Sequence, residues 1–262
     1  MKAKNKKTAG FGIKAMIIIL GIILLVVVSL YAFGIRVGTF GITKATEVNI
    51  LDLPEESEIF LDNQSVGIRK GNISLKLAPG FHSILISKFG FWPYLENVEI
   101  KDKNTTTIRP FFVLQNPSGV MIGNQTKEYK EIAPLFDIPN DPDKELVSKN
   151  EVVTISYEDG QIFAKWLADK NDAPEYLCDK ETEKCQKTAV FKPTTKLRNM
   201  SFFKDRDDVL IIAIEKGIFA LELNPQGTQN LQPIFEGKSP EFRIKDGFLY
   251  AKDEGSLILI SI

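Results

Sequence analysis

The sequence predicts an all-β ectodomain that follows a single transmembrane helix. Two observations carry this prediction. An apolar stretch without any charge covers residues 15–35, and from about residue 46 onward short segments rich in β-branched and aromatic residues alternate with turn residues. The overall composition, with 44% apolar and 26% charged residues, is that of a globular chain and not of a disordered one.

The stretch 15–35 reads AMIIILGIILLVVVSLYAFGI. At about 1.5 Å of rise per residue, a helix of this length crosses a hydrocarbon core of about 30 Å. Its apolar residues lie on all sides, which disfavours a helix buried against one face of a soluble core. The alternative is a cleaved secretory signal with a small-residue site at 32–34. Because the apolar run exceeds the usual signal core of about 7–15 residues, an uncleaved anchor is favoured.

The charges around this stretch predict its orientation. Five lysines precede residue 15, and the first acid is Glu47. Basic residues stay on the cytoplasmic side of a membrane, so we expect a cytoplasmic basic tail at 1–14, a juxtamembrane linker at 36–45 and all later residues outside the cell. The whole chain holds 33 basic and 34 acidic residues, and the part outside the tail is therefore acidic. The bilayer is an expected partner, and nucleic acid is not.

Short strands are expected throughout residues 46–114, which predicts a small antiparallel β-sandwich. The dipeptide Pro79-Gly80 suits a tight turn, since proline fixes φ near −65° and glycine accepts positive φ. In the segment 82–88, alternation places Ile84 and Ile86 on one face. The other expected turns are Leu53-Pro54, Asp62-Asn63, Gly90 and 102–104.

Three blocks in this region resemble the PEGA domain, a small β-sandwich of prokaryotic surface proteins. They read VNILDLPEESEIFLDNQSVG, LKLAPGFHSILISKFGFWPY and VEIKDKNTTTIRPFFVL. The middle block is the most specific, with a Pro-Gly turn, a histidine, an alternating strand and then an aromatic residue and a proline. The resemblance implies a binding or architectural module at the cell surface, with no catalytic residues to transfer.

Residues 115–150 are expected to form a linker and the first strands of a second part, with a short helix starting near Pro142. Residues 151–262 contain repeated hairpins, in which Gly160 and Gly217 occupy equivalent turns. Blades of a propeller take about 40–45 residues, so the region after Leu114 holds about three of them. An incomplete, propeller-like domain and a meander sandwich both remain open. The part from Lys187 onward also resembles regions that follow PEGA domains in membrane-anchored proteins of small-genome bacteria.

Cys178 and Cys185 are the only cysteines and flank a polar turn. Outside the membrane they are expected to form a disulfide, and two free thiols are the alternative. In the loop-entropy model this small ring adds about 2.5 kcal/mol. The only histidine, His82, is far away in sequence, so no metal site is expected.

The aromatic group Phe91, Trp92 and Tyr94 is the other notable cluster. Aromatic rings stack on sugars and anchor interfaces, so Trp92 and Tyr94 are candidate ligand contacts; the alternative is that they fill a core. Phe91 is expected in the core, and Tyr94 nearer to water. Acids such as those at 205–208 are expected to be solvated turn residues and not a calcium site.

No nucleophile elbow, phosphate loop or zinc-protease motif occurs, so no catalytic residue and no cofactor is expected. The sequence thus predicts a non-catalytic, membrane-anchored module outside the cell membrane that binds or scaffolds cell-wall polysaccharide or another surface protein. The alternative is an envelope hydrolase or a sensor component with an unrecognised site.

Overall fold

The computed structural model describes most of the chain and divides it into two compact units. Unit 1 holds residues 1–55, 69–82 and 98–109, and unit 2 holds 56–68, 83–97 and 110–262. Residues 1–7 of the expected basic tail and the expected turn at 102–104 lie outside the described residues. These are 8–32, 35–38, 41–101, 105–117, 119–169, 172–179, 182 and 184–262.

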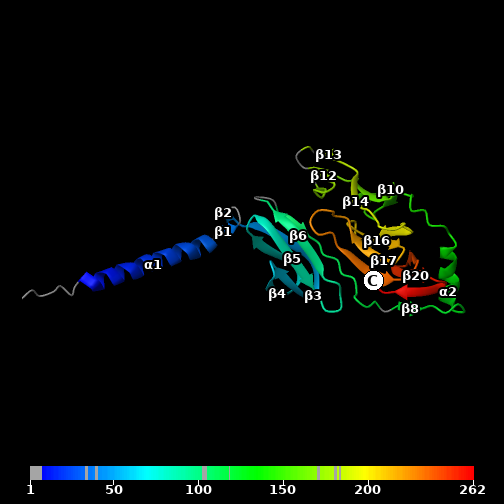
Figure 1. Cartoon of the computed structure of the whole chain (residues 1–262), viewed down its shortest axis with the longest axis horizontal. Coiled ribbons are helices and arrows are strands. Elements are labelled where there is room, and N and C mark those ends of the chain that lie inside the picture. Colours follow the sequence, from blue (N-terminus) through cyan, green and yellow to red (C-terminus); the bar gives the residue numbers. More distant parts are fainter. Residues whose placement is uncertain are drawn as a thin grey trace, which may run out of the picture. The chain divides into compact units, whose positions relative to one another are not determined.

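The one long helix, α1, runs from Thr8 to Ala32 and thus starts before the expected segment (Figure 1). Among the residues that the structure describes, no helix combines the length and the apolar content needed to cross a membrane. The expected transmembrane helix at 15–35 is therefore not supported. The expected linker at 36–45 also contains regular structure, a short hairpin of β1 (Ile35–Gly38) and β2 (Gly41–Lys44).

The region 46–108 forms one five-stranded sheet with the order β4-β3-β5-β6, in which β7 also pairs with β3. The β3–β5 pair is antiparallel, as expected, but β7 runs parallel to β3. Ile84 and Ile86 are both fully buried. The strands are β3 (Thr46–Leu61), β4 (Gln64–Leu77), β5 (Gly80–Ser87), β6 (Tyr94–Ile100) and β7 (Thr106–Ile108).

The expected turn at Leu53-Pro54 is wrong, because β3 continues through it. Asp52 and Glu56, which flank this dipeptide, instead have φ of 58° and 62°. Local kinks at these two residues let the strand continue without a turn. The turn at Asp62-Asn63 is present, with both residues at positive φ as a two-residue hairpin turn between β3 and β4 requires.

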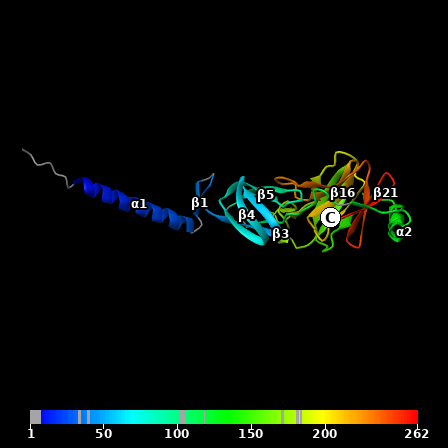
Figure 2. The ribbon, with the colours of Figure 1, turned by 90° about the horizontal axis from the view of Figure 1, so that it is seen from below.

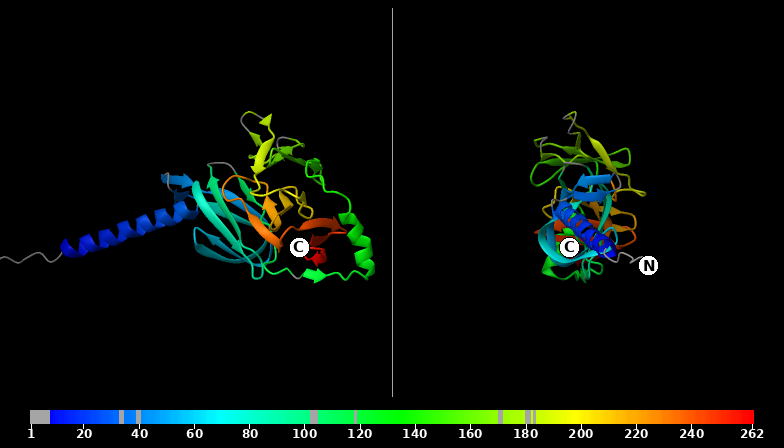
Figure 3. Two further views of the ribbon diagram at one scale, coloured as in Figure 1. Left: turned by 45° about the vertical axis from the view of Figure 1, so that its right-hand side comes forward. Right: turned by 90° about the vertical axis from the view of Figure 1, so that its left-hand side faces the viewer.

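Three four-stranded antiparallel sheets make up most of unit 2 (Figure 3). Their strand orders are β14-β11-β10-β9, β15-β16-β17-β18 and β19-β20-β21-β8. The third sheet joins distant parts of the chain, since β8 (Gly119–Met121) pairs with β21 (Ser256–Ile260). The others are β9 (Leu146–Val147), β10 (Val153–Glu158), β11 (Gln161–Trp166), β14 (Thr188–Phe191), β15 (Asn199–Phe202), β16 (Val209–Ile214), β17 (Gly217–Glu222), β18 (Leu231–Glu236), β19 (Glu241–Lys245) and β20 (Phe248–Asp253).

The expected hairpins are present, but the two glycines thought to be equivalent are not. Gly160 lies in the β10–β11 turn with φ of 76°. Gly217 instead is the first residue of β17 and pairs with Ile214. A Cβ on Gly217 would lie 2.6 Å from the carbonyl oxygen of Phe235, so glycine is needed here for a close approach to β18 and not for a turn.

The helix expected near Pro142 lies elsewhere. Helix α2 covers Lys127–Ile132, and its N-terminus is capped by the hydroxyl of Thr126, which accepts from the amide of Tyr129 at 3.1 Å. A short 3₁₀ helix, η1 (Ala133–Phe136), follows. Pro142 instead lies in a turn closed by the amide of Lys144, which donates to the carbonyl of Asp141.

Two apolar clusters hold the described part of unit 2. The larger cluster packs β10 and β11 against β16 and β17 and includes Leu177 and Cys178. The smaller cluster packs α2 and η1 against β20 and β21, and Figure 2 shows α2 beside β21. The first two sheets therefore share one apolar cluster, whereas the third sheet packs against α2 and η1.

Candidate ligand-binding site

The turn at Pro79-Gly80 is buried and connects two strands of the sheet. Gly80 has φ of 138°, which favours glycine, and it begins β5. A ring nitrogen of His82 lies 2.8 Å from the carbonyl oxygen of Ala78. His82 thus holds the turn across four residues.

The three aromatic residues after this strand have different environments. Tyr94 is 2% exposed, whereas Phe91 and Trp92 are only partly buried. Phe91 packs edge-on against Phe112, with ring centroids 6.2 Å apart. The expectation that Phe91 is core and Tyr94 lies nearer to water is therefore wrong: Tyr94 is the core residue.

Gln232 on β18 joins the segment that carries Trp92 to a second loop. Its side-chain oxygen accepts from the amide of Val113 at 3.1 Å, and its side-chain nitrogen donates to the carbonyl of Pro93 at 3.3 Å. The amide of Trp92 also donates to the carbonyl of Val113 at 2.8 Å. Since Gln232 is 4% exposed, these bonds are shielded from water and fix the backbone around Trp92.

A pocket of about 540 Å³ lies beside Trp92, and we call it the Trp92 pocket. Its walls combine one indole, one phenyl ring, prolines and polar side chains. A mixture of this kind suits a ligand with both apolar faces and hydroxyl groups. The lining residues are Trp92, Gln115, Asn116, Pro117, Pro233, Ile234, Phe235 and Glu236.

The indole nitrogen of Trp92 is buried and has no hydrogen-bond acceptor within the described part of the chain. A buried donor without a partner costs about 1–3 kcal/mol. A small shift of the side chain that brought this nitrogen to a ligand acceptor would recover that energy. The unsatisfied donor thus distinguishes Trp92 from an ordinary packing residue.

Tyr94 is at the centre of a buried polar group in unit 2, which we call the Tyr94 cluster: Tyr94, Glu96, Glu222 and Asn230. The phenol oxygen lies 2.7 Å from a carboxyl oxygen of Glu222 and 3.1 Å from one of Glu96. Asn230 donates to the other Glu222 oxygen at 2.7 Å. Asn230 also pairs with the backbone of Leu95 through both its side-chain oxygen and its side-chain nitrogen.

One carboxyl group of the Tyr94 cluster is expected to be protonated. A phenol has a single O–H group and can donate to only one carboxylate. If it donates to Glu222, the contact with Glu96 is a hydrogen bond only when Glu96 is protonated and donates to the phenol oxygen. Burial, followed by the nearby charge of Glu222, raises the pKa of Glu96 to about 8, which agrees with a protonated Glu96 at neutral pH.

The remaining sequence candidates have structural partners. Cys178 and Cys185 are joined by a disulfide that bridges the short strands β12 (Cys178–Asp179) and β13 (Lys184–Cys185), with Cα atoms 4.0 Å apart. Arg206 donates to both carboxyl oxygens of Asp208, at 2.6 and 2.7 Å. In the described residues, no group of three or more potential ligands is arranged to hold a metal ion.

Sequence reasoning found Trp92 but missed Glu96, Glu222 and Asn230. Glu222 follows Tyr94 by 128 residues, and no periodicity connects them. Two acids within otherwise apolar strand patterns, in YLENVEI and GIFALE, were the available signal. The two carboxyl groups lie in the core, and neither lines the Trp92 pocket.

Comparisons with known proteins identify one region of the chain. Residues 46–113 match the family model of the PEGA domain, which confirms the resemblance seen in the sequence. No curated protein matches the chain. One similar solved structure is a candidate membrane-associated protein of unknown function from Bacteroides fragilis. The match covers 82% of this chain and 97% of that chain, with 9% sequence identity and a TM-score of 0.23. A similarity at this TM-score supports no argument.

Proposed function

Since residues 46–113 match the PEGA domain, we propose that this chain is a non-catalytic, membrane-attached binding module of the cell envelope. In this proposal, a segment of a polysaccharide binds in the Trp92 pocket. The observation that carries the proposal is the Trp92 pocket, which has a wall of aromatic and polar side chains and includes a tryptophan whose buried indole N–H has no acceptor among the described residues. Sugar rings present an apolar face for an aromatic ring and hydroxyl oxygens for such a donor.

Replacing Trp92 with alanine is expected to weaken retention on an envelope polysaccharide preparation about tenfold or more, because a tryptophan at the centre of a binding surface contributes about 2 kcal/mol. Trp92→Phe keeps an aromatic ring but lacks the N–H group, so its retention should lie between that of wild type and that of Trp92→Ala. Affinity electrophoresis in gels containing the polysaccharide measures retention, and circular dichroism measures the melting temperature.

The matched control is Phe89→Ala, which removes an aromatic ring that is fully exposed and does not line the pocket. It should leave retention unchanged. Equal retention of wild type and Trp92→Ala, with both proteins folded, would remove the Trp92 pocket from the proposal. Equal losses in the Trp92 and Phe89 variants would indicate nonspecific adsorption instead.

Membrane attachment is the second part of the proposal, and it is supported by the surface of α1. The described side chains from Met16 to Val28 include twelve large apolar ones that are exposed, for example Leu20 at 67% and Leu25 at 68%. A continuous apolar surface of this kind is unfavourable in water and favourable in contact with lipid. The lysines before α1 favour an N-terminus on the cytoplasmic side.

Replacing Leu24 with arginine is expected to shift the protein from the membrane fraction toward the soluble fraction, since a charged group in the middle of an apolar segment costs about 2.5–3.5 kcal/mol on insertion scales. Flotation of the full chain with lipid vesicles measures the distribution. Leu24→Phe is the control and should float like wild type. If the arginine variant also floats like wild type, lipid contact through α1 is not the cause of attachment.

We also propose a propeller-like arrangement for the three sheets of unit 2. The edge strands β9, β15 and β19 each supply residues to one pocket. In a propeller, one edge strand of every blade lines the central channel in the same way. The pairing of β8 with β21 completes the third sheet with a strand from earlier in the chain. Three sheets agree with the number of blades that the length of the region allows.

The rival proposal, an envelope hydrolase, has a specific test in the same pocket. Glu236 is the one acid that lines the Trp92 pocket. A hydrolase that used it for general acid or base catalysis would lose turnover in Glu236→Gln. Retention on polysaccharide should survive this change if the chain is a binding module, and release of sugar by wild type but not by Glu236→Gln would favour the hydrolase.

A further inference from the structure

A second pocket of about 230 Å³ lies where residues from one edge strand of each of the three sheets meet, and we call it the three-sheet pocket. Leu146 comes from β9, residues 199–201 from β15 and residues 242–244 from β19. The segment 140–144, which leads into β9, supplies the rest of the lining. No residue is shared with the Trp92 pocket.

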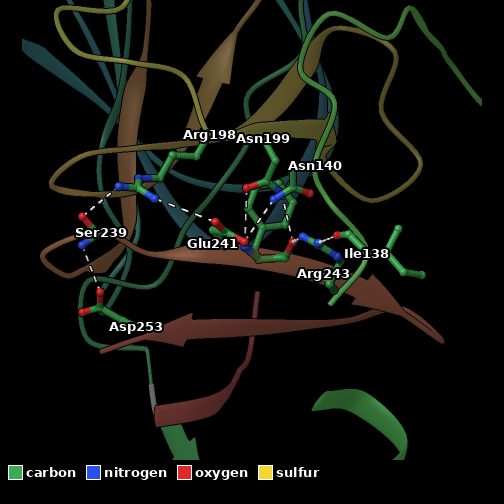
Figure 4. Close-up of polar contacts among 9 residues, drawn as sticks. Ile138, Asn140, Arg198, Asn199, Ser239, Glu241, Arg243 and Asp253 are labelled. Carbon is green, nitrogen blue, oxygen red and sulfur yellow. Dashed lines mark hydrogen bonds and ion pairs between the residues drawn. The ribbon is translucent and has the colours of Figure 1, made fainter. Parts of the chain in front are cut away.

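Asn199 and Arg198 hold β15 and β19 together at this pocket (Figure 4). The side-chain nitrogen of Asn199 donates to the carbonyl of Phe242 at 2.9 Å. Arg198 donates to the hydroxyl of Ser239 at 2.9 Å, and a second nitrogen lies 3.8 Å from a carboxyl oxygen of Glu241. The pocket wall is therefore held in place by side-chain bonds as well as by strand pairing.

Arg243 supplies a positive charge to the wall without a salt bridge. Three of its N–H groups donate to the carbonyls of Leu135, Phe242 and Ile138, at 2.9, 2.9 and 2.7 Å. Within the described residues this guanidinium forms no salt bridge. Burial lowers the pKa of Arg243, which means that its charge is partly desolvated, although the charge of Glu241 is near enough to act on it and to raise its pKa.

The fixed position of this guanidinium favours an anionic ligand. Its hydrogen bonds to the backbone fix the orientation of the planar group before a ligand binds. Arginine has five N–H groups, so two remain for a ligand after three have donated to carbonyls. A guanidinium matches the geometry of a carboxylate or a phosphate through paired hydrogen bonds. A partly desolvated cation without a carboxylate partner gains from such a ligand.

The exposed charges at the rim of the pocket have opposite signs. Lys144 adds a second positive charge, and Asp141 adds a negative charge. Both belong to one turn, in which the amide of Asp143 donates to the Asp141 carboxylate at 3.2 Å. The ionisable groups that line the pocket, Arg243, Lys144 and Asp141, carry one net positive charge. Glu241 lies just outside the lining, where it accepts from the side chain of Asn140 at 3.2 Å, so the binding of an anion depends on the fixed guanidinium of Arg243 and not on an excess of positive charge.

We propose that the three-sheet pocket binds a small organic anion through its carboxylate or phosphate group. The pocket is smaller than the roughly 300–1,000 Å³ of sites for drug-sized ligands, which limits the occupant to about one acidic sugar residue or one phosphate-bearing unit. The polar groups of Asn140, Asn199 and Ser201 line the same space and suit hydroxyl groups next to the anionic group. The proposal is independent of the function proposed for the Trp92 pocket.

Two substitutions at the rim are expected to change the Kd for an anion in opposite directions. Titration calorimetry of the full chain in detergent would use sodium glucuronate, inorganic phosphate and, as the neutral control, glucose. Wild type is expected to bind one or both anions with a Kd of about 1 mM and glucose more weakly. Lys144→Gln should raise the Kd about two- to fivefold, and Asp141→Asn should lower it by a similar factor, with both effects reduced at high salt.

Lys130→Gln is the matched control, since it removes an exposed lysine of α2 that does not line the pocket. It should leave the Kd unchanged. Arg243→Lys keeps the charge but removes the planar fork, so binding should be lost while melting shows whether the fold remains. Absence of binding by either anion up to about 20 mM in wild type overturns the proposal. So does an equal change of Kd in the Lys144, Asp141 and Lys130 variants.

Discussion

Replacing Tyr94 with alanine is expected to lower the free energy of unfolding by about 3–5 kcal/mol, the range for removing a buried aromatic ring. Tyr94 is 2% exposed and packs edge-on against Phe111 at 6.0 Å between centroids. Its hydroxyl also lies between Glu96 and Glu222, so alanine leaves two carboxyl groups without this bond. Denaturant unfolding of the full chain, followed by near-ultraviolet circular dichroism, measures the loss.

The control for this prediction is Tyr94→Phe, which keeps the ring and removes only the hydroxyl. It should cost about 1–3 kcal/mol, the penalty for leaving a buried polar group without its partner. A phenylalanine variant as stable as wild type would mean that the two carboxyl groups find other partners. An alanine variant as stable as wild type would contradict the burial of Tyr94 itself.

Raising the pH from about 4.5 to about 8 is expected to lower stability, with a slope approaching 1.4 kcal/mol per pH unit from Glu96 alone. Its pKa is about 8 in the folded chain against 4.5 for an ordinary glutamic acid. The folded state therefore keeps a proton that the unfolded state releases, so the stabilisation is fully present below pH 4.5 and is lost as the pH rises through 8. Burial also raises the pKa of Glu222, which acts in the same direction.

Glu96→Gln separates this contribution from the rest of the titration. Glutamine keeps the shape of the protonated acid and can donate to the phenol oxygen, but it has no proton to lose. Its stability between pH 4.5 and 8 should vary less than that of wild type. An unchanged pH profile in Glu96→Gln would assign the dependence to Glu222, whose pKa burial also raises.

The local turns of this fold could be predicted from the sequence because their signals lie within a few residues. Asp62-Asn63 and Gly160 have the positive φ values that their residue types favour. The PEGA region was recognisable for the same reason, since its Pro-Gly turn and alternating strand are contiguous. Pro142 was misread because proline suits a tight turn as well as the first turn of a helix, and the bonds around Asp141 decide between them.

The Tyr94 cluster could not be predicted because it depends on groups that meet only after folding. Phe91 and Tyr94 look equivalent as strand aromatics, and the acceptors that keep the hydroxyl of Tyr94 buried include Glu222, far along the chain. Gly227 shows the same limit. A Cβ at this glycine would collide with the carbonyl oxygen of Asn97, and nothing in the sequence near Gly227 indicates this close approach.

The pairing of β8 with β21 sets the order in which unit 2 can be completed during synthesis. Val120 lies opposite Leu259, so the third sheet gains its fourth strand only after residues 256–260 have left the ribosome, well over a hundred residues later than β8. Closing so long a loop is entropically costly and slow compared with forming hairpins such as β10–β11. Until then the backbone groups on that edge of β8 have no strand partner, and chains halted before residue 256 would present an open edge to their neighbours.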